Sequence, residues 1–263
     1  MTGSLWSARP TCGDYEFRGS TLRIEVTDPE EVLFPTDCGL SLLGALQTDT
    51  TFELANKTVL DVGAGSGVYT VALLAAGAAH VTALDVNTAS AAATRANVLR
   101  NGLDADRLTC VTSDLAEYAP TGRFDLVVTN PPHLPHDPSY TTAEGLEVAL
   151  VAGRDGRSLY DVVVARADDL VAPGGTLLVA HSSLADVGRT TRELGNRGYT
   201  ARTLEVYEMD IPLLAYAEHK QTLLGHLERL RDSGSATFEG DRFTVHAVAF
   251  QRPATTGEPE ETR

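Results

Sequence analysis

The chain has 263 residues, of which 43% are apolar and 22% charged. This composition is typical of globular proteins and excludes wholesale disorder, collagen and fibrous classes, and the length predicts one large domain or one domain with a cap. Lys and Arg number 21 against 36 Asp and Glu, a formal net charge of −15. Nucleic acid is therefore a disfavoured partner, because an acidic surface repels a phosphate backbone.

From the sequence we expect neither a targeting signal nor paired cysteines. No stretch approaches the roughly 18 apolar residues of a spanning helix, and the start MTGSLWSARP lacks the apolar core of a signal peptide. We therefore expect no membrane association and a cytoplasmic location. Cys12, Cys38 and Cys110 stand far apart, with no C-x-x-C pair and no His at metal spacing, so we expect reduced thiols and no metal site.

The first 50 residues precede the repeating pattern of the chain. Period-two apolar residues over 14–26, around Gly19-Ser20, predict a β-hairpin, and leucines at helical spacing over 36–47 predict an amphipathic helix. We expect residues 1–50 to form a cap, whose hairpin covers, together with the segment 207–231, the substrate side of a site in the following domain.

From Lys57 onward, strand-like and helix-like segments alternate. The strand-like runs are TVLDV, HVTALDV, RLTCVTS, FDLVVTN, GTLLVAH and ARTLEVY, and the helical stretches between them include 88–100, 158–171 and 185–198. This alternation predicts an α/β fold with a parallel sheet.

The C-terminal part continues with different elements. A helix over 216–232 precedes the strand-like runs ATFEG and DRFTVHAVAF, which meet at Gly240-Asp241. We expect a domain over 51–252 with a helical insertion at 207–235, and a disordered acidic tail at 253–263.

A glycine-rich turn follows the first strand of the alternation and opens its first helix. It has the spacing D-x-G-x-G-x-G, with Asp61, Gly63, Gly65 and Gly67. Glycines there allow the backbone to approach a ligand closely. A dinucleotide fingerprint needs its third glycine at the position of Val68, so the spacing indicates another class of nucleotide-type site.

This turn resembles motif one of the class I S-adenosylmethionine-dependent methyltransferases. The resemblance implies a Rossmann-like, doubly wound seven-stranded sheet, mostly parallel with an antiparallel last strand. It implies S-adenosyl-L-methionine as cofactor and S-adenosyl-L-homocysteine as product. It assigns Asp85, with Val86 beside it, to the ribose hydroxyls, and Asp114 with Leu115 to the adenine. Each carboxylate alone fits a solvated turn, but three matches at successive strand ends favour a cofactor site.

The fourth strand ends in Asn130-Pro131-Pro132-His133, which resembles the N-P-P-[YFWH] signature of methyltransferases that act on planar nitrogens. The Asn oxygen and a backbone carbonyl can accept both hydrogens of an NH₂ group, and the prolines fix φ and remove N–H donors. Alone, the tetrapeptide fits a simple turn. In this context the resemblance assigns catalysis to Asn130 and to His133, a flat ring that can also accept a proton.

Two further stretches resemble the HemK-type glutamine methyltransferases. FPTDCGLSLLGAL is similar to the helix entrance of that family and implies that Thr36 and Asp37 lie near the methionine end of the cofactor. Residues 153–157 with Asp161 are similar to its G-x-D-G-R-x-x-x-D stretch, whose arginines fit surface charges better than substrate contacts. The expected cofactor-binding residues are Thr36, Asp61, Gly63, Gly65, Gly67, Asp85, Val86, Asp114, Leu115 and Asn130.

The acceptor of the methyl group is either a protein glutamine or a small molecule. His133, Cys38 in place of Thr or Ser, and the segment after 206 depart from the release-factor methyltransferase pattern, so we favour a small molecule or free amino group. Tyr207, Tyr216 and His219 are candidate substrate contacts. Two other classes stay open: a cyclase that consumes S-adenosylmethionine and yields methylthioadenosine, and a non-catalytic cofactor-binding module.

Overall fold

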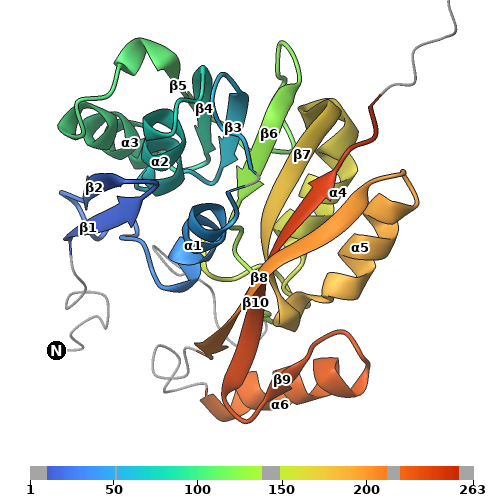
Figure 1. Cartoon of the computed structure of the whole chain (residues 1–263). Coiled ribbons are helices and arrows are strands. Elements are labelled where there is room, and N and C mark those ends of the chain that lie inside the picture. The colour runs from blue at the N-terminus through green and yellow to red at the C-terminus, as the bar shows by residue number, and fades with distance from the viewer. Residues whose placement is uncertain (1–10, 51, 138–148, 212–219, 255–263) are drawn as a thin grey trace, which may run out of the picture.

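The computed structural model describes residues 11–50, 52–137, 149–211 and 220–254. A central sheet has helices on both faces (Figure 1), so the predicted Rossmann-like fold is confirmed. Seven long strands run in the order β5-β4-β3-β6-β7-β10-β8, and the two-residue β9 pairs with β10 as an eighth. The strands are β3 (Thr58–Val62), β4 (His80–Asp85), β5 (Leu108–Thr112), β6 (Phe124–Thr129), β7 (Val171–Ser182), β8 (Thr200–Asp210), β9 (Phe238–Glu239) and β10 (Arg242–Gln251).

Strand direction divides the sheet into two parts. β3, β4, β5, β6 and β7 pair in parallel, and β10 is antiparallel to both β7 and β8. The predicted antiparallel last strand is therefore confirmed. It lies between β7 and β8, so both of its edges are paired, and Val245, Ala247 and Phe250 are fully buried.

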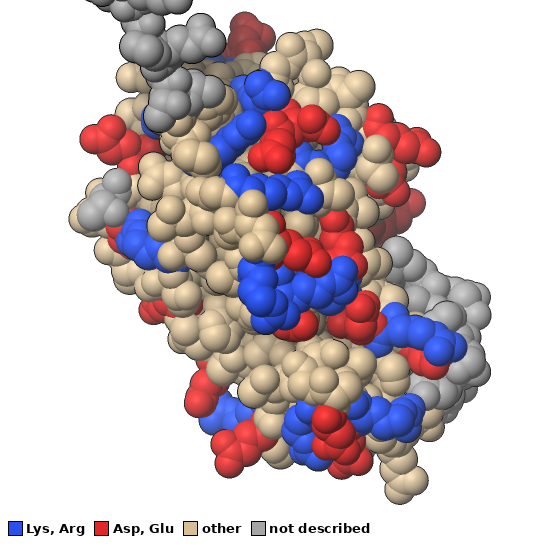
Figure 2. All heavy atoms as spheres, turned by 90° about the vertical axis from the view of Figure 1, so that its right-hand side faces the viewer, with Lys and Arg blue, Asp and Glu red and all other residues tan. Residues whose placement is uncertain are grey.

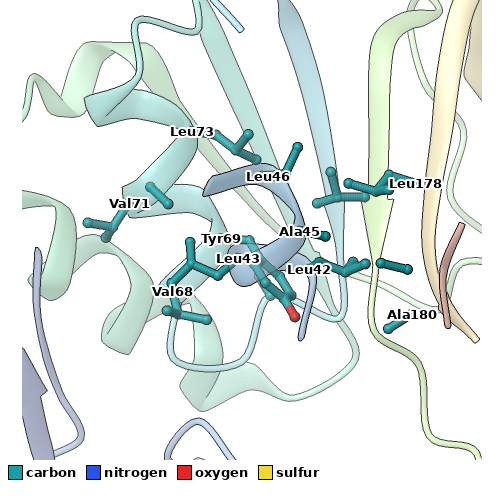
Figure 3. Close-up of a cluster of buried hydrophobic side chains, with 14 of the residues drawn as sticks. Leu42, Leu43, Ala45, Leu46, Val68, Tyr69, Val71, Leu73, Leu178 and Ala180 are labelled. Carbon is teal, nitrogen blue, oxygen red and sulfur yellow. The ribbon is translucent and has the colours of Figure 1, made fainter. Parts of the chain in front are cut away.

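Two hydrophobic cores form, one on each face of the sheet. The first lies under α1 (Ser41–Thr48), α2 (Val68–Ala75) and α3 (Thr88–Arg100), and the second under α4 (Ser158–Leu170) and α5 (Val187–Gly195). Figure 3 shows side chains of α1 and α2 meeting those of β7, with the Tyr69 ring among them. This packing fixes α1 against the part of the sheet formed by β7, β10 and β8.

The N-terminal hairpin forms a separate sheet of β1 (Cys12–Phe17) and β2 (Ser20–Glu25), turning at Gly19 with φ of 84°. It packs on the helices rather than on the central sheet: the Glu25 N–H donates to Asn97 Oδ1 at 3.0 Å, and Asn97 Nδ2 donates to the Glu25 carbonyl at 2.9 Å. The hairpin therefore extends the layer formed by α2 and α3 (Figure 1).

The C-terminal part contains α6 (Lys220–Asp232), followed by β9 and β10. The expected insertion at 207–235 begins within β8, because residues up to Asp210 pair with β10. Tyr216, His219 and most of the expected tail lie outside the described residues. None of the described helices is long and apolar enough to cross a membrane.

Candidate active site

A cavity of about 720 Å³ opens where β3, β4, β5 and β6 end, within the size range of small-molecule sites. This is the edge of an open α/β sheet at which ligands bind. Nine of the eleven predicted site residues line it: Thr36, Gly63, Gly65, Asp85, Val86, Asp114, Leu115, Asn130 and His133. Asp61 and Gly67 do not.

Asp85 connects two of these strand ends. Its Oδ2 accepts the N–H of Gly65 at 2.7 Å, and its Oδ1 accepts the N–H of Asn87 at 2.9 Å. A carboxylate offers about four acceptor positions, so two remain for hydroxyl groups of a ligand. The Asp85 carboxylate thus ties the glycine turn to the end of β4, and its remaining acceptor positions fit a ribose diol.

The glycines of the turn have two different roles. Gly63 and Gly65 have φ of 77° and 53°, and a Cβ built on Gly63 meets nothing within 4 Å, so the turn leaves open space beside the cavity. At Gly67, by contrast, a Cβ would lie 2.8 Å from Thr94 of α3. Gly67 therefore allows α2 and α3 to approach closely, which explains why it does not line the cavity.

Asp61 lies beneath the turn with no exposed surface. Its Oδ2 accepts a hydrogen bond from Thr70 Oγ1 at 2.7 Å, but its Oδ1 has no partner among the described residues. Burial raises the pKa of Asp61 to about 7. A buried carboxylate oxygen without a partner is costly, and it fits a site whose ligand carries the positive charge of a sulfonium.

The adenine end expected from the sequence has an apolar wall. Val86 is 63% exposed and Leu115 is buried, and both line the cavity. Asp114 is exposed, and its Oδ1 accepts the N–H of Ala116 at 2.7 Å, which fixes the turn after β5. An exposed apolar side chain in a cavity fits a flat ring, and the adjacent carboxylate fits its amino group.

A short 3-10 turn, η1 (Cys38–Leu40), brings the entrance segment to the end of β6. Thr36 Oγ1 accepts the N–H of Gly39 at 3.0 Å, and the Tyr69 hydroxyl donates to the Gly39 carbonyl at 2.5 Å. Cys38 Sγ then lies 3.9 Å from Asn130 Oδ1 and 3.8 Å from His133 Nε2. Both predicted catalytic side chains therefore meet one thiol at this corner of the cavity.

The Asn-Pro-Pro-His loop is supported from the other side by residues 150–156. The N–H groups of His133 and Leu134 donate to the Leu150 carbonyl at 3.1 and 2.9 Å. Gly156 has φ of 73°, and a Cβ there would lie 2.5 Å from the His133 carbonyl oxygen. The conformation of this loop thus depends on a glycine more than 20 residues downstream.

Arg157 corrects the expectation of a surface charge. It is 2% exposed, and its guanidinium donates to the carbonyls of Ala185 and Asp186 at 2.6 and 2.9 Å and to Thr190 Oγ1 at 3.1 Å. It also pairs with Asp161 at 2.9 Å. Arg157 joins α4 to the start of α5 and does not line the cavity.

The expected cover of the substrate side is wrong for the hairpin, whereas other residues of the expected cap line the cavity. No residue of β1 or β2 lines the cavity, and Tyr207 instead donates to Glu205 Oε2 at 2.7 Å and lies against Gly44 of α1. The described cover consists of residues 31–39, Phe243 and, from the expected segment 207–231, Met209 and Asp210.

Sequence reasoning missed Tyr69, Met209 and Phe243. Tyr69 lies in an apolar helix, and the other two lie in alternating strands, so nothing local distinguishes them from core residues. Their contribution to the cavity becomes visible only when distant segments of the chain pack together.

The described lining carries five carboxylates, those of Glu31, Asp37, Asp85, Asp114 and Asp210, and no Lys or Arg. Figure 2 shows basic and acidic side chains interleaved on the side of the molecule that carries α5, with no uniformly basic patch on that face. Within the described ranges, no group of three or more His, Cys, Asp or Glu could hold a metal ion. The cavity thus has an electrostatic character opposite to that of a phosphate-binding site.

Comparison with known proteins agrees with this geometry. Residues 37–197 match the family described as "Methyltransferase small domain". A protein of Methanocaldococcus jannaschii, provisionally named as a protein N5-glutamine methyltransferase, is 28% identical over 169 residues, covering 64% of this chain and 81% of that protein. The 4-amino-L-phenylalanine/4-methylamino-L-phenylalanine methyltransferase of Streptomyces pristinaespiralis is 34% identical over 179 residues, covering 65% of this chain and 58% of that protein.

A solved structure shares the fold. The Thermus thermophilus 16S rRNA N2 G1207 methyltransferase, in complex with AdoMet and guanosine, superimposes with a TM-score of 0.56 and 19% identity, covering 92% of this chain and 50% of that one. The family match spans more than half of the chain, and the sheet, the glycine turn and the Asn-Pro-Pro-His corner are those expected of such an enzyme. The chain therefore belongs to the methyltransferase small domain family and is an S-adenosylmethionine-dependent N-methyltransferase of its HemK-like branch.

Proposed function

We propose that the enzyme methylates a planar nitrogen of a small molecule, an arylamine or a carboxamide, and that Asn130 positions this nitrogen. The observation that carries the proposal is the corner where Asn130, Cys38 and His133 meet beside an apolar wall of Leu134 and Phe243. Such a corner fits a flat, weakly polar group with one hydrogen-bonding end.

Asn130 has the chemistry for positioning. Its amide oxygen accepts from an N–H of the acceptor, which directs the nitrogen lone pair away from Asn130. Gly63, Gly65 and Asp85 would hold S-adenosylmethionine, whose sulfonium supplies an activated methyl group. The protein then contributes alignment, which can be worth about 7 to 11 kcal/mol for well-oriented reactants.

The choice of a small molecule rests on the size and charge of the cavity. About 720 Å³ must hold both the cofactor and the acceptor group, which leaves little room for a folded partner to enter. The acidic lining and the net charge of −15 disfavour nucleic acid. The name of the Streptomyces pristinaespiralis relative, an arylamine methyltransferase, supports the same choice.

A protein glutamine is the second candidate, and the name of the Methanocaldococcus jannaschii relative favours it. A carboxamide side chain can reach the same corner if it stands on an extended loop. The cytoplasmic location expected from the sequence accords with three free cysteines and stays part of the proposal.

The test is a methyl-transfer assay with two acceptors, 4-aminophenylalanine and a release factor that contains the candidate glutamine. Mass spectrometry of the acceptor and of the nucleoside product reads the outcome. We expect a methylated arylamine and S-adenosylhomocysteine. Methylation of the release factor alone would establish the second candidate, and methylthioadenosine without added acceptor would establish the cyclase.

A further inference from the structure

One ring nitrogen of His133 has a fixed role. Its Nδ1 lies 3.1 Å from the carbonyl oxygen of Pro131, two residues earlier in the same loop. A carbonyl only accepts hydrogen bonds, so Nδ1 carries the hydrogen. Burial lowers the pKa of His133, which keeps the ring neutral at physiological pH. Nε2 therefore carries a lone pair and is a hydrogen-bond acceptor.

The neighbour of that lone pair is Cys38. The thiol lies 3.8 Å from His133 Nε2 and 3.9 Å from Asn130 Oδ1. Burial and the nearby Asp37 raise the pKa of Cys38 to about 12, so the sulfur keeps its proton and acts as a donor. The S–H of Cys38 can donate to His133 Nε2 or to Asn130 Oδ1. The lone pairs of these two atoms therefore face the same corner of the cavity.

We infer that His133 Nε2 accepts the proton that the acceptor nitrogen loses on methylation, and that Cys38 is a positioning residue for His133 and Asn130. This inference rests on the proposed function and deepens it. With Cys38 holding His133 in place, the proton goes to a base that is already oriented in the site and not to bulk water.

The atoms and electrons of the step balance. With S-adenosylmethionine bound, the nitrogen lone pair forms the new N–C bond while the S–C bond breaks and its electron pair stays on sulfur, leaving a thioether. The nitrogen then carries a positive charge and one surplus proton. His133 Nε2 takes that proton and becomes imidazolium, whose Nδ1–H still donates to the Pro131 carbonyl. Water removes the proton before the next turnover.

This arrangement selects among acceptors. A neutral imidazole takes a proton from a stronger acid, and a methylated arylammonium or a protonated amide is one. An aliphatic ammonium is a far weaker acid and keeps its proton, and before the reaction it has no free lone pair. The site is therefore matched to planar nitrogens of low basicity.

Few charged or titratable groups face His133 from the neighbouring elements. η1 contributes Cys38, with Asp37 exposed beside it, and β10 contributes the uncharged ring of Phe243, 5.8 Å from the His133 ring between centroids. β7 contributes His181, whose pKa burial lowers to about 3, so it stays neutral. β8 contributes Met209 and, at the exposed end of the strand, Asp210, which pairs with Arg242 at 3.6 Å.

The first measurement needs no acceptor. ¹⁵N NMR of the free protein should show His133 as the neutral Nδ1–H tautomer at pH 7. Cys38→Ala should move the Nε2 resonance and Cys38→Ser should restore much of it, whereas Cys110→Ala, at a half-buried cysteine outside the cavity, should leave it unchanged. An Nε2–H tautomer would overturn the inference.

The second measurement is the pH dependence of kcat with 4-aminophenylalanine and with a small carboxamide. We expect kcat of the unmodified enzyme to fall at low pH as His133 is protonated. His133→Phe keeps the flat ring, and it should lower kcat about 100-fold and abolish that acidic limb, with KM little changed.

The two proposals fail differently. If neither planar acceptor is methylated by the unmodified enzyme, the proposed function fails and this inference fails with it. If methylation occurs but His133→Phe retains the kcat and the pH profile, only the inference fails.

Discussion

The cofactor end of the cavity comes from one stretch of chain, residues 62–115, whereas the acceptor end joins segments that range from residue 36 to residue 243. At the cofactor end, strand ends that follow one another in sequence are held by backbone bonds to Asp85. At the acceptor end, η1, the end of β6 and β10 meet through side chains. A site of the first kind follows from a local motif, and a site of the second kind depends on the whole fold.

The largest expected effect separates the two ends. Asn130→Ala should lower methyl transfer about 100-fold or more, because a displaced acceptor nitrogen loses its alignment, while the affinity for S-adenosylmethionine stays nearly unchanged. Product formation and calorimetric titration measure the two quantities. Asn196→Ala, at an exposed position after α5, is the matched control. Loss of cofactor binding with turnover retained per bound complex would reverse the assignment.

The opposite pattern is expected at Asp85. Asp85→Ala should weaken binding of both S-adenosylmethionine and S-adenosylhomocysteine by about 1.5 to 3 kcal/mol, since it removes a charged acceptor and the anchor of the glycine turn. Asp114→Ala loses one local bond and should cost less. Calorimetry decides, and an unchanged affinity in Asp85→Ala would remove this residue from the site.

Gly156, which packs against the Asn-Pro-Pro-His loop from a distant part of the sequence, gives a third test. Gly156→Ala places a methyl group 2.5 Å from the His133 carbonyl oxygen and should lower turnover about tenfold, because the loop must shift. Gly102→Ala shares the positive φ, here 65°, but meets nothing within 4 Å, so it should leave turnover unchanged. Equal turnover in the two variants would show that the contact does not position the loop.

Asp61 gives a test that is measured as the pH dependence of stability and not as turnover. Its folded-state pKa of about 7 lies above the unfolded value of 3.8, so between these values the folded protein holds a proton that the unfolded chain has lost. Stability therefore falls as pH rises through this window, by up to about 1.4 kcal/mol per pH unit, and levels off above it.

Thermal unfolding of the free protein from pH 5 to pH 8 tests this sign. Asp61→Asn should flatten the dependence, and Asp106→Asn, at an exposed position, should not. A stability that rises from pH 5 to pH 7 through Asp61 would contradict the raised pKa.

The sequence predicts much of this molecule because its signals are local. Alternating segments predict the parallel sheet, and the turn from Asp61 to Gly67 with Asp85 predicts the edge at which the cavity lies. Gly67 and Arg157 show the limit of such signals. Both belong to matching motifs, yet Gly67 lets α2 approach α3 closely and Arg157 joins α4 to α5.

The remaining parts of the site could not be predicted for a physical reason. Phe243 and Met209 reach the cavity only because β10 inserts beside β8, and Tyr69 contributes through one bond to η1. The alternation that places a residue on one face of a strand does not say which distant segment faces it.

The position of β10 also has a consequence for synthesis on the ribosome. β7 and β8 emerge well before the strand that separates them, so their facing edges wait for a partner while the chain is still growing. β10 then supplies Val245 and Ala247 to one core and Val248 and Phe250 to the other. A premature stop before Arg242 therefore leaves two open strand edges and two incomplete cores, features that promote aggregation, instead of a shorter working enzyme.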